Sequence, residues 1–155
     1  MAQTFHGLTV EQIIGINRQM IESSGDDVFI EPDNLRLSGM IAQISEEVQA
    51  TYFGEDRFPT AIEKAAVLAW RIIAGHLFHN GNKRTGIMVC YQTLEFNRFE
   101  LLATDDDVVA VATAIALGNT HPDHLSQADF IMWVQNHTRA RKSKRRSSRS
   151  RGAKR

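Results

Sequence analysis

Residues 60–84 read TAIEKAAVLAWRIIAGHLFHNGNKR. Thr60, with Glu63 three positions later, is a capping pattern, because each side chain can satisfy a backbone N–H group at the start of a helix. The apolar residues that follow recur at helical spacing and form one stripe, made by Ala65, Leu68, Ala69, Ile72 and Ile73. This stretch therefore predicts a central buried helix that leads into a loop at residues 76–84.

Similar start signals and breakers divide the rest of the chain into helices. Five more helices are expected: one from Thr9 toward Glu22, one from about Asp33 to Ala50, one after Asn82, and two that open at Thr104 and Ser126. Before the central helix, aromatic residues flank a glycine-containing turn at residues 52–59, which favours a short hairpin. The sequence thus predicts an all-α fold, a compact bundle of about six helices with a hairpin before the central one.

Charge is divided unevenly along the 155 residues of the chain. Residues 1–138 hold all 18 Asp and Glu but only 8 Lys and Arg, so their net charge is −10. The other 10 basic residues lie in residues 139–155, which show no apolar periodicity. We therefore predict one domain over residues 1–138 and a basic, disordered tail over residues 139–155.

Several classes of protein are disfavoured by composition. Cys90 is the only cysteine, so an internal disulfide and a four-cysteine zinc site are excluded, and its apolar neighbours predict a buried, reduced thiol. No run approaches the roughly 18 apolar residues of a membrane span, and the first residues lack a basic segment followed by an apolar one. We expect a cytoplasmic protein without a membrane partner.

The loop at residues 76–84 combines groups that suit a phosphate. Gly81 permits close approach of the backbone, Asn82 can cap the following helix, and N–H groups at a helix start attract anions. Lys83 and Arg84 add positive charge there. His76, at the other end of the loop, can accept a proton near neutral pH, and Phe78 is expected to face the core.

Residue by residue, the same loop also fits an ordinary Asn-Gly turn with two solvated cations. As a whole, however, the string resembles the signature of the Fic/Doc family, His-x-Phe-x-Asp/Asn-Gly/Ala-Asn-Lys/Gly-Arg. Seven positions match, namely His76, Phe78, Asn80, Gly81, Asn82, Lys83 and Arg84. The resemblance covers about residues 8–138 and is greatest to the death-on-curing (Doc) toxins of type II toxin–antitoxin systems.

The resemblance implies a role for each part of the site. His76 is expected to be the base that takes the proton from a hydroxyl of a target protein, and Lys83 and Arg84 are expected to assist catalysis. Nucleotide binding is assigned to Asn80, Gly81, Asn82, Lys83 and Arg84. The family aligns its target by main-chain pairing at a flap, for which the resemblance suggests Phe53, Gly54, Glu55, Asp56, Arg57 and Phe58.

Two departures from the AMP-transferring members of the family indicate the reaction. Those enzymes usually have Gly where this chain has Lys83, and a second Arg a few positions after the first, whereas here Thr85, Gly86, Ile87 and Met88 follow Arg84. Both departures match Doc, which implies transfer of the γ-phosphoryl group of ATP to a Ser or Thr hydroxyl, with elongation factor Tu as the family precedent. The alternative is AMP transfer to a protein hydroxyl.

Asn80 occupies the position where many active members carry a Mg²⁺-binding carboxylate. Its neutral carbonyl oxygen makes Asn80 a weak candidate metal ligand, so affinity for Mg²⁺ should fall unless the phosphates of ATP supply most of the ligands. This residue also leaves open a catalytically inactive module that binds partners. We find no convincing Ser/Thr-x-x-x-Glu-Gly/Asn inhibitory motif, so restraint is expected from a separate antitoxin.

The basic residues 139–155 leave two interpretations open. Such a run can bind nucleic acid through salt-sensitive release of counterions, with little sequence preference. It can equally lie on the acidic body of the same chain as a solubilising arm.

Overall fold

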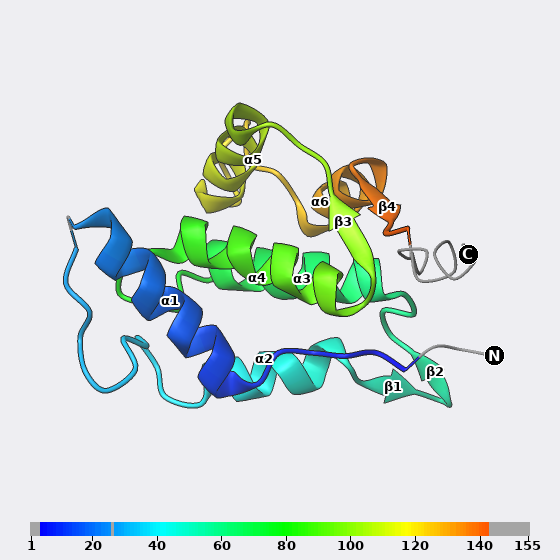
Figure 1. Cartoon of the computed structure of the whole chain (residues 1–155), viewed down its shortest axis with the longest axis horizontal. Coiled ribbons are helices and arrows are strands. Elements are labelled where there is room, and N and C mark those ends of the chain that lie inside the picture. The colour runs from blue at the N-terminus through cyan, green and yellow to red at the C-terminus, as the bar shows by residue number, and fades with distance from the viewer. Residues whose placement is uncertain (1–3, 26, 143–155) are drawn as a thin grey trace, which may run out of the picture.

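The structure of the chain, a computed structural model, describes residues 4–25 and 27–142. Within these residues it contains six α-helices and four short strands (Figure 1). The helices are α1 (Val10–Ser24), α2 (Met40–Val48), α3 (Ala61–Ala74), α4 (Asn82–Phe96), α5 (Asp105–Ala116) and α6 (Gln127–Asn136). The strands are β1 (Thr51–Tyr52), β2 (Glu55–Asp56), β3 (Phe99–Leu101) and β4 (Thr138–Ala140). The predicted bundle of about six helices is confirmed.

Helix α3 is the central buried element, as its sequence predicts. The Thr60 side chain accepts a hydrogen bond from the Glu63 N–H, and the predicted apolar stripe is buried. One face of α3 packs with α1 and α2, and the other packs with α4, α5 and α6. Because both faces are covered, α3 fixes the positions of the two chain segments that adjoin its ends.

Helices α3 and α4 approach each other closely at Gly86. A Cβ atom built on this residue would lie 2.5 Å from Ile73 Cγ1 and 3.0 Å from the Ala69 carbonyl oxygen. Only glycine allows this approach, which holds the start of α4 beside the end of α3.

Helix α2 begins later than the sequence pattern indicates. The predicted start at Asp33 is wrong, because Asn34 and Gly39 have the positive φ angles of 59° and 85° that a right-handed helix excludes. Instead, Leu35 forms an isolated antiparallel bridge with Phe78. The amphipathic pattern is real from Met40 onward, but the residues before it pair with the loop between α3 and α4.

The predicted hairpin is formed by β1 and β2, with Tyr52 opposite Glu55. Its turn is Phe53-Gly54, with φ angles of 53° and 82°, as a tight two-residue hairpin turn requires. The Lys64 ammonium on α3 binds the Asp56 carboxylate and the Phe58 carbonyl oxygen. The hairpin is therefore anchored at the N-terminal end of α3.

The folded part of the chain extends past the predicted boundary at residue 138. Strand β4 pairs with β3, and the Arg141 N–H donates to the Arg98 carbonyl oxygen at 2.8 Å. The boundary placed between residues 138 and 139 cuts through β4 and is corrected accordingly, because this pairing satisfies backbone groups on both sides of it. The rest of the predicted tail, residues 143–155, lies outside the described residues.

None of the helices in the described parts of the chain has the length and apolar character needed to cross a membrane.

Candidate active site

The loop between α3 and α4 carries His76 at the C-terminal end of α3. The His76 side chain is exposed, and its φ angle of 47° lies in the left-handed region. Leu77 and Phe78 follow and are buried, so Phe78 faces the core as predicted. The buried apolar side chains of Leu77 and Phe78 anchor the loop in the core, while the imidazole of His76 stays at the surface.

Asn82 stabilises this loop in a way that the sequence did not indicate. It does not cap α4; it is the first residue of the helix, after Gly81. Its side chain donates to the Phe78 carbonyl oxygen and accepts from the Phe78 N–H, both at 2.9 Å. The predicted cap is therefore corrected to a clamp that closes the loop on itself.

Gly81 meets two demands at once. Its φ angle is 75°, and a Cβ atom there would lie 3.1 Å from Asn17 Nδ2 and 3.2 Å from Ile21 Cγ1 of α1. With no side chain at this position, the loop packs directly against α1. The N–H groups of the first helical turn, residues 82–84, have no acceptor within the helix and form an anion-attracting end.

Asn80 is predicted as a nucleotide contact and as a metal ligand. Its Oδ1 accepts from Asn34 Nδ2 at 2.9 Å, and its Nδ2 donates to the Val28 carbonyl oxygen at 2.9 Å. Both ends of the carboxamide are thus engaged within the protein. The described residues also hold no group of three or more His, Cys, Asp or Glu side chains suited to a metal ion. This donor set does not fit a protein-held Mg²⁺.

The segment that precedes α2 lies against the loop as a short strand-like pair. The Arg36 N–H donates to the Leu77 carbonyl oxygen and the His79 N–H donates to the Asn34 carbonyl oxygen, both at 2.9 Å. The exposed Arg36 guanidinium contacts the His76 carbonyl oxygen at 3.4 Å. Sequence reasoning missed Arg36, since it was assigned to the body of a helix.

A small hollow lies beside His76. Its volume is about 270 Å³, and it is lined by Arg36, Leu37, Met40, Gly75, His76 and Leu77. Leu37 is 63% exposed. The hollow therefore offers a cation and apolar surface next to the imidazole.

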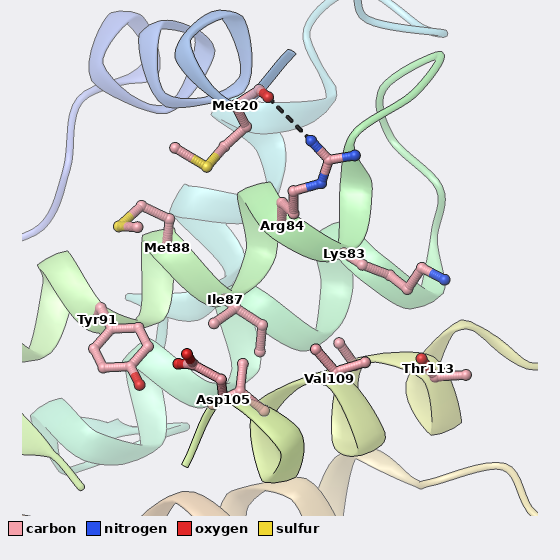
Figure 2. A pocket seen from close by; sticks show the side chains of 11 residues that line it. Met20, Lys83, Arg84, Ile87, Met88, Tyr91, Asp105, Val109 and Thr113 are labelled. Carbon is pink, nitrogen blue, oxygen red and sulfur yellow. Dashed lines mark hydrogen bonds between the residues drawn. The ribbon is translucent and has the colours of Figure 1, made fainter. Parts of the chain in front are cut away.

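Lys83 and Arg84 point in different directions from the start of α4. Arg84 Nη1 donates to the Met20 carbonyl oxygen of α1 at 3.1 Å, while Lys83 extends away from it (Figure 2). Both side chains are exposed. The sequence-predicted pair of cations thus flanks the helix start on two sides.

A larger cavity of about 490 Å³ continues from these cations along the groove between α4 and α5. It is lined by Met20, Lys83, Arg84, Ile87, Met88, Tyr91, Asp105, Val108, Val109, Ala112 and Thr113. Tyr91 and Asp105 lie at one end and Lys83 toward the other (Figure 2). Burial, followed by the nearby Asp105 charge, raises the pKa of the Tyr91 hydroxyl, which keeps it protonated as a donor.

The predicted flap residues, Phe53 to Phe58, are not brought to this site. They lie at the opposite end of α3, whose 14 residues separate the two ends by about 20 Å (Figure 1). Asp56 is bound to Lys64. The hairpin expectation holds, but its location does not match a strand that aligns a target beside His76.

Cys90 lies on α4 and is completely buried, as predicted. Burial raises the pKa of its thiol to about 12. The thiolate that nucleophilic chemistry needs is therefore scarce at neutral pH.

The chain is similar to known proteins over the part that contains this site. The model of the Fic/DOC family matches residues 7–94. Toxin Doc of Mycolicibacterium smegmatis is 29% identical over 91 residues, which cover 59% of this chain and 70% of that toxin. No solved structure gives a significant match. The matched residues include the loop that carries His76, the start of α4 and the segment before α2.

Proposed function

The chain belongs to the Fic/DOC family, and from this premise we propose that it is a Doc-like toxin that transfers the γ-phosphoryl group of ATP to a Ser or Thr hydroxyl of a target protein. Members of the family are in general enzymes that modify proteins. The observation that carries the proposal is the exposed His76 in the loop that leads to an open, cationic helix start. Elongation factor Tu is the family precedent for the target.

In this reaction His76 is the general base. The imidazole takes the proton from the target hydroxyl as the hydroxyl oxygen forms a bond to the γ-phosphorus of ATP. The bond from that phosphorus to the oxygen bridging the β and γ phosphates breaks, and ADP leaves. The left-handed backbone at His76 supports this role, because strained residues persist where neighbouring structure holds them for function.

The start of α4 is the proposed phosphate site. Backbone N–H groups of residues 82–84 supply donors, Gly81 leaves room, and Lys83 and Arg84 supply charge. Such groups stabilise the charge that spreads over the transferred phosphoryl oxygens. Because Asn80 does not fit as a protein ligand for Mg²⁺, any metal ion would be held by the phosphates.

The cavity between α4 and α5 is the proposed site of the nucleoside. Its volume of about 490 Å³ lies within the usual range for small-molecule sites, roughly 300–1,000 Å³. Lys83 and Tyr91 are eight residues apart on α4, or about 12 Å. A nucleotide is therefore accommodated with phosphates at the cationic end and the base near Tyr91 and Asp105.

The target is proposed to approach along the segment at residues 34–37. This segment already pairs with the loop, and its Arg36 and Leu37 border the hollow next to His76. An extended peptide that adds to such an edge gains main-chain hydrogen bonds. The hairpin at residues 51–56 is too far away for this task.

To test this proposal, the wild-type protein is incubated with a bacterial lysate and with ATP labelled at either the α or the γ phosphate. His76→Ala is the test variant, and His79→Ala is the matched control, because His79 is an exposed histidine in the same loop. We expect label from the γ position only, with a loss of at least about 100-fold in His76→Ala, the scale of general-base catalysis. His79→Ala is expected to retain transfer.

Other outcomes assign the chain differently. Transfer of the α label would indicate AMP addition, despite Lys83 and the lack of an arginine among residues 85–88. Equal labelling by wild type and His76→Ala would overturn the proposed chemistry.

A second function is favoured by Asn80 alone. Since both ends of its carboxamide are hydrogen-bonded within the protein, the chain can be an inactive Fic-type module that binds a partner or nucleic acid. Absence of labelling, combined with tight binding of nucleic acid that is lost on deleting residues 143–155, would support this alternative.

We also propose that a separate antitoxin restrains the protein, as the Doc-like assignment implies. Coexpression of a candidate antitoxin is expected to relieve growth inhibition, which is measured by colony counts with wild type and with His76→Ala. Inhibition that no coexpressed partner relieves would argue against an antitoxin.

A further inference from the structure

Three asparagines form a closed cycle of hydrogen bonds beneath the loop that carries His76. Asn34 Nδ2 donates to Asn17 Oδ1 at 2.8 Å and to Asn80 Oδ1 at 2.9 Å. Asn17 Nδ2 donates to the Asn80 carbonyl oxygen at 3.1 Å and to Thr85 Oγ1 at 3.0 Å. The cycle joins α1, the segment before α2, the loop and the first turn of α4.

The cycle has one consistent orientation of its amides. Rotating the Asn34 carboxamide by a half turn would set its oxygen against the oxygens of Asn17 and Asn80, and its NH₂ against the Ile30 N–H that now donates to Asn34 Oδ1. Asn17 and Asn34 are 0% and 1% exposed. Buried amides whose donors and acceptors are all paired specify a single arrangement of their neighbours.

The main chain of Asn34 adds to this arrangement. Its φ angle is 59°, a conformation that asparagine tolerates better than most residues. Its carbonyl oxygen accepts from the His79 N–H, and its N–H donates to the Ile30 carbonyl oxygen at 2.7 Å. One residue therefore holds the loop both through its side chain and through its backbone.

We propose that Asn34 is a positioning residue for the nucleotide site. Through Asn17 and Asn80 it fixes the loop so that the His76 imidazole and the α4 amides share one ligand. The inference rests on the proposed function for the identity of that ligand, ATP. Because Asn34 also directs Arg36 into its pairing with Leu77, the same residue sets the target-facing segment and the phosphate-facing loop relative to each other.

The cycle also explains why an amide suits position 80. Asn80 must accept from Asn34 and donate to the Val28 carbonyl oxygen. A carboxylate would accept from Asn34 but would face the Val28 carbonyl oxygen without a proton to donate. In this chain the loop is locked by neutral hydrogen bonds where a metal-binding carboxylate could otherwise stand.

The test uses Asn34→Asp, which keeps the size and backbone preference of the residue but replaces the NH₂ donor by an acceptor. The matched control is Asn97→Asp at the other end of α4. Asn97 is also buried, and its Nδ2 donates to the carbonyl oxygens of Thr93 at 2.7 Å and His6 at 2.9 Å. Both variants lose two buried donor contacts, but only one contacts the loop.

Two readouts are measured on the full chain: the Kd and KM for ATP, and hydrogen exchange at the amides of residues 79–84. We expect Asn34→Asp to raise Kd and KM about 10- to 100-fold, since losing one hydrogen bond from the loop to a charged phosphate oxygen costs that much affinity. It should also speed exchange at these amides, with Asn97→Asp near wild type in both. A merely structural role would lower stability in both variants alike without this difference.

Equal ATP affinity and equal loop exchange in the two variants would overturn the inference. If wild type binds no ATP, the proposed function fails, yet the exchange comparison still decides whether Asn34 fixes the loop. If Asn34→Asp does not fold, Asn34→Gly replaces it, because glycine accepts the positive φ angle and only the side-chain bonds are lost. Wild-type exchange in the folded Asn34→Gly protein would also overturn the inference.

Discussion

A tight turn held by side-chain hydrogen bonds lies at each end of α3, but the two turns have different roles. At the N-terminal end, a charged lysine holds the hairpin turn that contains Phe53 and Gly54. At the C-terminal end, a cycle of neutral amides holds the loop that contains His76 and Gly81. Both turns use positive φ angles, and each end borders a helix start and a cavity, but only the start of α4 lacks a side-chain cap and carries two exposed cations, Lys83 and Arg84. Position relative to these groups, rather than turn geometry, separates the site from a structural corner.

The largest expected effect comes from a pair of glycine substitutions that should break the symmetry between the two ends. Gly81→Ala meets Asn17 and Ile21 as well as an unfavourable φ angle, whereas Gly54→Ala has the same kind of φ angle with no atom within 4 Å. We expect Gly81→Ala to weaken ATP binding about 100-fold, because displacing the loop removes hydrogen bonds to charged phosphate oxygens. Gly54→Ala should lower stability by about 1 kcal/mol and leave ATP binding unchanged. Calorimetric titration and urea unfolding measure the two quantities.

A comparable loss of ATP binding in both glycine variants would contradict the division of roles. It would mean that the conformation of the hairpin also affects ATP binding.

Much of the fold was predictable because local signals and tertiary packing agree. The capping side chains of Thr9, Thr60, Thr104 and Ser126 all accept the expected hydrogen bonds. The start of α2 was not predictable from periodicity, because the bridge from Leu35 to Phe78 joins residues far apart in sequence. Non-local pairing of this kind leaves no repeat in the sequence.

For the candidate site, the sequence identified the loop but not its support. His76 and Lys83 stand out in a short motif, whereas Asn17, Asn34 and Arg36 are polar residues in unrelated segments. The flap was assigned to Phe53–Phe58 from the resemblance to Doc, which implied that this segment lies beside His76. A helix, however, separates the segments at its two ends by its whole length.

The second prediction compares two lysine substitutions, Lys64→Met near the hairpin and Lys83→Met at the candidate site. Lys64→Met removes the bonds to Asp56 and the Phe58 carbonyl oxygen, and we expect it to lower the free energy of unfolding by about 1–2 kcal/mol. Transfer of the γ-phosphoryl group should not change. Lys83→Met, an exposed substitution in the first turn of α4, is expected to leave the free energy of unfolding unchanged and to lower transfer. Urea unfolding and the labelling assay separate these outcomes; a fall in transfer for Lys64→Met would link the hairpin to the reaction.

A third prediction concerns the strained residues themselves. Phe53 is fully exposed at a positive φ angle, and Asn is strongly preferred at this position of a two-residue hairpin turn. Phe53→Asn should therefore raise stability by about 0.5–1 kcal/mol without affecting transfer. His76→Asn gives the same local relief at the site end but should abolish transfer. If Phe53→Asn also lost transfer, Phe53 would have to contact the target, despite its distance from His76.

The smallest expected effect is a pH dependence near the site end of α3. Arg71, in the last turn of α3, binds Glu47 of α2 at 2.8 Å. Hydrogen bonds from Arg71 and then Gln43 lower the pKa of the Glu47 carboxyl below its ordinary value of 4.5. A carboxyl whose pKa is lower in the folded state adds stability above its unfolded pKa and loses it as the pH falls through the folded pKa.

Glu47→Gln should therefore be slightly less stable than wild type at neutral pH, and the difference should shrink as the pH falls below about 4.5. Urea midpoints at pH 7 and about pH 3 measure this change. Glu46→Gln is the control, since Glu46 is exposed and forms no ion pair among the described residues. Because the asparagine cycle carries no titratable group, acid that weakens the Glu47–Arg71 pair should leave the loop amides protected from exchange. If that protection were lost together with the ion pair, the asparagine hydrogen bonds would depend on the Glu47–Arg71 ion pair.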